Sequence, residues 1–159
     1  MVTSLRRGEI VIGKILPYLG ISIILIIVIF ALTAWHFDVH FHGPLMLALI
    51  CFLFLLCSLG LGLLISAFSR TQTQAIQFSV FFLLPVFVLS GAFAPLEQLP
   101  KAIRYVSELF PLTHFCRAFR LVNMYHATPS FYAVDLIVLL AGALITFLGA
   151  AFLLKRIEE

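Results

Sequence analysis

Four long apolar runs dominate the pattern of hydrophobic and polar positions along the chain. They cover residues 15–35, 45–68, 75–93 and 131–154, and the only charged side chain within them is Asp135. A helix needs about 20 apolar residues to cross a hydrocarbon core about 30 Å thick, so each run is long enough to span a membrane. The runs are apolar on every face, whereas the strands of a membrane β-barrel alternate apolar and polar positions. The pattern therefore predicts an all-α membrane protein with about four transmembrane helices.

The stretch between the third and fourth runs, residues 94–129, is interrupted by proline and polar residues. Gly91 and Pro95 end the third run, Pro100 is placed to start a short helix, and Pro111 separates that helix from a second one. Neither short helix can span a membrane alone. We expect a re-entrant or interfacial helical hairpin on the external side, with an amphipathic loop lying on the outer surface as the alternative.

Both short helices are predicted to be amphipathic. In the first, Arg104 and Glu108 are four positions apart and are expected to pair. The second has an apolar face and a cationic face, made respectively by Phe115, Phe119 and Val122 and by Arg117 and Arg120. Such helices suit a boundary between apolar and polar surroundings.

Composition and charge favour a single membrane domain over residues 1–159. The sequence is 63% apolar and 11% charged, whereas about 25% of residues are charged in a typical soluble domain. No repeat or low-complexity linker divides it. The net charge is +3, but the basic residues are scattered instead of forming a stripe, so we expect no nucleic-acid partner.

Basic residues flank the apolar runs mainly on one side. They precede the first run, separate the second from the third, and follow the fourth, as Arg6, Arg7 and Lys14, Arg70, and Lys155 and Arg156. The positive-inside rule then predicts a multi-pass topology with both termini in the cytoplasm.

The N-terminal stretch, residues 1–14, is expected to lie at the membrane interface and to turn into the first span at Gly8 or Gly13. Gly8, Gly13 and Lys14 also match the first part of a nucleotide-binding loop. The match fails because Ile15 replaces the hydroxyl residue that binds magnesium and no strand precedes the loop. We therefore expect no ATP site here.

A possible metal site lies between the first two runs. In an extended conformation, alternate residues would place His36, Asp38, His40 and His42 on one face, and such a set can bind zinc or copper. The simpler interpretation is a short external connection that needs polar residues. A metal-handling membrane protein thus stays open as an alternative.

Small residues recur every fourth position in two runs, which lets helix backbones approach closely. They are Ser58, Gly62 and Ser66 in the second run and Gly142, Thr146 and Ala150 in the fourth. We expect these stripes to pack within one bundle.

The sequence shows no energy source for transport and no catalytic constellation. Ion-driven transporters carry ionisable residues near the bilayer midplane. Here the nearest candidate, Asp135, is one turn inside its run and is expected to reach the interface. We therefore expect a non-enzymatic chain without a cofactor of its own.

Three stretches resemble a known family. The run Leu-Ser-Gly-Ala-Phe-Ala-Pro-Leu-Glu-Gln-Leu-Pro at 89–100, and Leu-Phe-Pro-Leu-Thr-His-Phe at 109–115 followed by Arg120, are similar to the signature of type-2 ABC transporter permeases of the drug and polysaccharide exporter class. Val-Thr-Ser-Leu-Arg-Arg-Gly-Glu at 2–9 is similar to the loop where those permeases touch their ATPase. Phe110 replaces a frequent Asn, and Ser4 a frequent Pro.

The resemblance implies a permease subunit of an ATP-driven exporter in the bacterial inner membrane. ATP and magnesium would bind a separate cytoplasmic ATPase subunit. A second permease copy or a homologous half would complete the pathway. Membrane lipid would surround both. The coupling residues implied are Leu5, Arg6, Arg7, Gly8 and Glu9, and the outer-gate residues implied are Gly91, Pro95, Pro100, Pro111, Arg117 and Arg120.

The chain corresponds to the C-terminal half of such a permease, since family members begin with an earlier span and an external domain. It is then either a fragment or a short subunit that relies on a separate N-terminal permease segment. A non-transporting membrane scaffold or a truncated permease remnant is the other alternative. The sequence does not identify a substrate.

Overall fold

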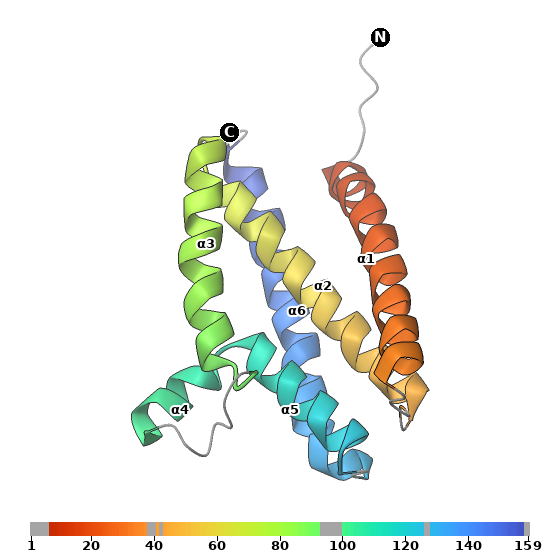
Figure 1. Cartoon of the computed structure of the whole chain (residues 1–159). Helices are drawn as coiled ribbons and strands as arrows, with labels where there is room; N and C mark the ends of the chain where they lie inside the picture. Colours follow the sequence, from red (N-terminus) through yellow and green to blue (C-terminus); the bar gives the residue numbers. More distant parts are fainter. Residues whose placement is uncertain (1–6, 38–40, 42, 93–99, 126–127, 158–159) are drawn as a thin grey trace. The chain divides into compact units, whose positions relative to one another are not determined.

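The computed structural model describes residues 7–37, 41, 43–92, 100–125 and 128–157 (Figure 1). Every regular element in these ranges is a helix: α1 (Arg7–Phe37), α2 (Pro44–Phe68), α3 (Gln72–Leu89), α4 (Lys101–Ser107), α5 (Pro111–Asn123) and α6 (Pro129–Ile157). Four of them, α1, α2, α3 and α6, are long and apolar enough to cross a membrane, which confirms the predicted fold class. The chain divides into two compact units, Met1–Phe41 and His42–Glu159, and α1 is the helix of the first.

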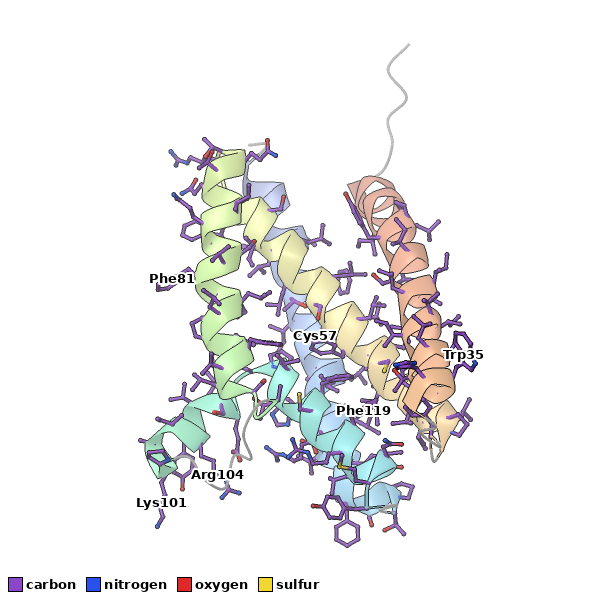
Figure 2. All side chains as sticks on the ribbon, viewed as in Figure 1. Trp35, Cys57, Phe81, Lys101, Arg104 and Phe119 are labelled. Carbon is purple, nitrogen blue, oxygen red and sulfur yellow. The ribbon has the colours of Figure 1, made fainter. Side chains whose placement is uncertain are left out.

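Helix α1 runs without interruption into the first candidate span, Ile15–His36. The predicted turn at Gly8 or Gly13 is therefore wrong. Continuing the helix pairs backbone groups that would otherwise stay unsatisfied near the hydrocarbon. Trp35, close to the end of α1, is 86% exposed and points away from the helix (Figure 2).

The predicted metal-binding face is only partly described. His36 lies in the last turn of α1, so it is helical and not extended. Asp38, His40 and His42 lie outside the described residues. Within the described part of the chain, no group of three or more His, Cys, Asp or Glu side chains is arranged to hold a metal ion.

Helices α2 and α6 form the core of the second unit and cross each other (Figure 1). Fully buried side chains from both helices meet there, among them Leu47, Ile50, Cys57 and Leu139. The closest approach is at Gly60, where an added Cβ would lie 2.2 Å from Thr146 Oγ1. Only glycine leaves room for this contact.

The two small-residue stripes behave differently. Gly142, Thr146 and Ala150 of α6 face α2, and a Cβ on Gly142 would lie 3.1 Å from Cys57 Sγ. This agrees with packing inside one bundle. The stripe of α2 does not face α6: Ser58, Gly62 and Ser66 are exposed, and nothing lies within 4 Å of a Cβ on Gly62. Ser58 and Gly62 lie instead on the side of α2 toward Ser79 and Phe82 of α3. The α2 surface that packs on α6 carries Cys57 and Gly60 instead.

Helix α3 presents apolar side chains outward over most of its length. Phe81 is 80% exposed and projects from it (Figure 2). Thr71 starts the helix by accepting a hydrogen bond from the backbone N–H of Gln74. The turn before it carries Arg70 and lies at the same end of the second unit as the C-terminal end of α6, away from α4 and α5 (Figure 1).

Two short helices connect α3 to α6, as the prolines predict. The carbonyl of Pro100 accepts the first hydrogen bonds of α4, and Pro111 occupies the first turn of α5. Helix α5 packs against α2 and the first half of α6 and buries Thr113, Ala118 and Val122. It thus lies beside the candidate span Pro129–Phe152, and the choice between a re-entrant hairpin and an amphipathic loop on the outer surface stays a prediction.

Candidate functional site

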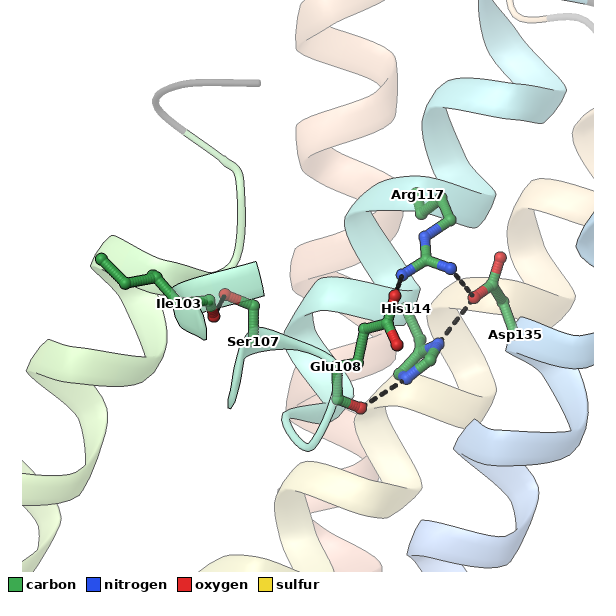
Figure 3. Close-up of polar contacts among 6 residues, drawn as sticks. All are labelled: Ile103, Ser107, Glu108, His114, Arg117 and Asp135. Atoms are coloured by element: carbon green, nitrogen blue, oxygen red, sulfur yellow. Dashed lines mark hydrogen bonds and ion pairs between the residues drawn. The ribbon is translucent and has the colours of Figure 1, made fainter. Parts of the chain in front are cut away.

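A polar cluster joins α4, α5 and α6. Its members are Glu108, His114, Arg117 and Asp135 (Figure 3). Glu108 is the residue at which α4 ends. His114 and Arg117 are three positions apart on α5 and so share one face of that helix. Asp135 lies near the start of α6 and faces them.

His114 is held at both ring nitrogens. Its Nδ1 lies 2.6 Å from Oδ1 of Asp135, and its Nε2 lies 2.9 Å from the backbone carbonyl oxygen of Glu108 (Figure 3). Only 7% of the His114 side chain and 3% of the Asp135 side chain are exposed. The imidazole thus ties the end of α4 and the first turns of α6 to α5.

Arg117 lies between the two carboxylates. Its guanidinium is 3.6 Å from Oδ1 of Asp135 and 3.7 Å from Oε1 of Glu108. The predicted pairing of Glu108 with Arg104 is wrong, because Glu108 ends α4 and its side chain turns toward α5. Arg104 is exposed and makes no ion pair with Glu108.

Asp135 is 2% exposed and packs against α5; its predicted position at the membrane interface stays a prediction. Burial of a carboxylate is tolerated when a cation and a hydrogen-bond donor face it. The contact with Asp135 also changes the pKa of His114. The hydrogen bond to Asp135 raises the pKa of the His114 imidazole above its ordinary value, against the opposing effect of burial.

Two of the predicted gate residues meet at the end of α3. The Arg120 guanidinium donates a hydrogen bond to the carbonyl oxygen of Gly91 over 3.1 Å. Gly91 has a φ of 78°, which lets the chain leave α3 at low conformational cost. The contact joins the C-terminal end of α3 to α5.

The other predicted residues are placed individually. Pro100 and Pro111 start α4 and α5, Arg117 belongs to the polar cluster, and Pro95 lies outside the described residues. Of the coupling residues, Arg7, Gly8 and Glu9 open α1, whereas Leu5 and Arg6 lie outside the described residues.

Two hollows accompany these elements. An apolar groove of about 310 Å³ lies between α2 and α3, lined by Leu61, Leu64, Ile65, Phe68, Phe78, Phe81 and Phe82. A second hollow of about 210 Å³ lies along α5, where Phe115, Phe119 and Arg120 form part of the wall. Neither was apparent from the sequence.

The family model of the ABC-2 type transporter matches residues 1–124. This chain belongs to the ABC-2 type transporter family. The match covers α1 to α5, including the Arg120 contact with Gly91.

Curated relatives agree with this membership. The chain is 29% identical over 153 residues to the probable multidrug ABC transporter permease YbhS of Escherichia coli, covering 95% of this chain and 40% of the relative. It is 32% identical over 118 residues to the probable multidrug ABC transporter permease YbhR of the same organism, covering 72% and 32%. It is also 30% identical over 111 residues to the linearmycin resistance permease protein LnrN of Bacillus subtilis, covering 70% and 29%.

The chain thus spans less than half the length of these ABC-2 relatives. They are permeases, which agrees with the absence of a catalytic constellation in the sequence. No solved structure matches the chain.

The polar cluster was not predicted from the sequence. Asp135 was the available signal, because an ionisable residue inside an apolar run points to a partner elsewhere in the chain. The partner, His114, lies 21 positions earlier, and no local spacing connects the two.

Proposed function

We propose that this chain forms membrane-spanning helices of an ATP-driven exporter in a bacterial inner membrane. The observation that carries the proposal is the ABC-2 match over residues 1–124. Relatives named as multidrug and drug-resistance permeases make drug-like compounds the first substrates to test.

The proposed exporter takes its energy from a separate ATPase subunit, which binds ATP and magnesium. The residues around Gly8 and Gly13 are helical in α1 and do not form a phosphate-binding loop. Residues 5–9 are proposed to contact the ATPase. Because Arg7 is continuous with the span through one helix, a push at this end can be transmitted along α1.

The α4–α5 hairpin is the proposed outer gate, with both termini in the cytoplasm. It is fastened to α3 by Arg120 and to α6 by the polar cluster, so movement of either span moves the hairpin. A second permease copy, or a homologous half, completes the pathway. A separate N-terminal permease segment is a further proposed component.

Co-expression with an ATPase subunit encoded beside the gene tests the proposal. We expect the tagged chain in detergent to retain the ATPase, and Arg7→Glu to reduce recovery at least several-fold. Arg70→Glu is the matched control, because it reverses an exposed charge at the α2–α3 turn and is expected to leave recovery unchanged.

If Arg7→Glu retains the ATPase at the wild-type level, residues 5–9 do not form the coupling surface. Failure of the wild-type chain to retain the ATPase, in the presence of a second permease copy, would instead favour a membrane scaffold or remnant. Both chains must first be shown to insert in the membrane in equal amounts.

A further inference from the structure

Both ring nitrogens of His114 face oxygen atoms. A backbone carbonyl can only accept a hydrogen bond, so Nε2 must carry a hydrogen to bond Glu108. Nδ1 lies 2.6 Å from Asp135 Oδ1, and two lone pairs would repel each other at that distance. A second hydrogen therefore lies between these atoms. This separation fits a charge-assisted bond.

We infer that His114 and Asp135 form a buried proton-binding site that fastens the re-entrant helix α5 to α6. With the proton bound, the pair is an imidazolium facing a carboxylate. Without it, the neutral imidazole keeps only one N–H for two acceptors. One of the two contacts, to Glu108 or to Asp135, must then be lost.

The charges around the site favour the bound proton. Glu108 from the end of α4 and Arg117 from α5 are the other ionisable groups in contact with the cluster. Protonated His114 and Arg117 balance the carboxylates of Glu108 and Asp135. Loss of the proton leaves one uncompensated negative charge next to apolar helices, which is costly.

No other packed element supplies a compensating charge. The residues of α2 and α3 include no Asp, Glu, His, Lys or Arg. On α4, Lys101 and Arg104 are exposed, and neither makes an ion pair with the cluster. Among the described residues, the ion pairs of the His114–Asp135 pair therefore involve the four cluster members alone.

The direction of the pH dependence follows from the raised pKa of His114. An imidazole in an unfolded chain has a pKa of about 6.5. The stability that protonated His114 gives the folded state is complete below that value. It is lost as the pH rises through the higher pKa of His114 in the folded state. Helix α5 is thus fastened most firmly below a pH of about 6.5 and loosens as the pH rises through the higher His114 pKa of the folded state. Its relevance to an outer gate rests on the proposed function.

Nitrogen-15 NMR of histidine-labelled protein in lipid nanodiscs tests the inference without any ATPase or transported compound. We expect the titration midpoint of the His114 ring to lie above the ordinary imidazole value of about 6.5. Asp135→Asn lowers its titration midpoint. Arg117→Gln raises it, because the guanidinium opposes the charge on His114. General destabilisation would not move the His114 titration midpoint in opposite directions in these two variants.

Hydrogen–deuterium exchange of α5, corrected for intrinsic rates, supplies the structural readout. Protection of α5 is expected to fall several-fold above the His114 midpoint, while α2 stays protected. Asp135→Asn abolishes this step, because a neutral amide can pair with a neutral imidazole. A His114 midpoint at or below the ordinary value of about 6.5, or an α5 step that persists in Asp135→Asn, would overturn the inference. Neither result would bear on ATPase binding.

Discussion

At the scale of single residues, close contacts decide which positions are irreplaceable. Gly60 and Gly62 lie two positions apart on α2, but only Gly60 faces α6. The sequence correctly indicated that small residues of α6 pack inward. It did not indicate which helix the α2 stripe would face, because the spacing of small residues does not say which neighbour each side of an all-apolar helix meets.

Gly60→Ala is expected to destabilise the α2–α6 pair by about 1–3 kcal/mol, because the added Cβ meets Thr146. The thermal midpoint of the purified protein in detergent measures this loss. Gly62→Ala is the matched control and is expected to change the midpoint little. Equal effects of both substitutions would contradict the assigned packing face.

At the scale of elements, the connections between helices depend on backbone conformation as much as on side chains. The prolines and glycine of the hairpin predicted its two helices, since Pro fixes φ and Gly91 permits the positive φ at the exit of α3. The links between elements were not predicted. The contact of Arg120 with Gly91 joins residues 29 positions apart.

Arg120→Gln is expected to free the end of α3 from α5, because it removes a hydrogen bond from a charged donor worth about 1.5–3 kcal/mol. Limited proteolysis of the hairpin in detergent measures the change, and cleavage is expected to become faster. Arg104→Gln is the control, since Arg104 is exposed and outside the polar cluster. Unchanged cleavage in Arg120→Gln would show that this contact does not hold the hairpin.

Gly91→Ala tests the same junction through the backbone. A side chain at a φ of 78° costs about 1–2 kcal/mol. We expect a lower thermal midpoint than in Ala92→Gly, the neighbouring change that keeps Gly91. A midpoint as high as that of the wild type would mean that α3 ends elsewhere in the folded protein.

At the scale of the whole molecule, the apolar runs predicted the spans well. The hydrocarbon core offers no hydrogen-bond partners, so a spanning segment must be a continuous helix that pairs its own backbone N–H and C=O groups. Helix α3 differs in its limits, covering Gln72–Leu89 where residues 75–93 were predicted. Hydropathy does not detect its end, because the Phe and Ala residues after Gly91 are as apolar as those before it. The backbone at Gly91 ends the helix instead.

The topology is testable from the two ends of the second unit. In intact cells, a cysteine replacing exposed Lys101 is expected to react with a membrane-impermeant maleimide, whereas one replacing Arg70 reacts only after the membrane is opened. The parent chain is the control, because Cys51 and Cys57 are buried and Cys116 is partly buried. The reverse labelling pattern would place the termini outside.

Trp35 gives the first unit an intrinsic optical reporter. It is the sole tryptophan in the sequence, so the indole fluorescence of the chain arises from one position near the end of α1. Its exposed ring leaves the emission open to quenching by bromine atoms placed at known depths in lipid chains. The depth of that end of the first span can therefore be measured in the unlabelled, unsubstituted protein.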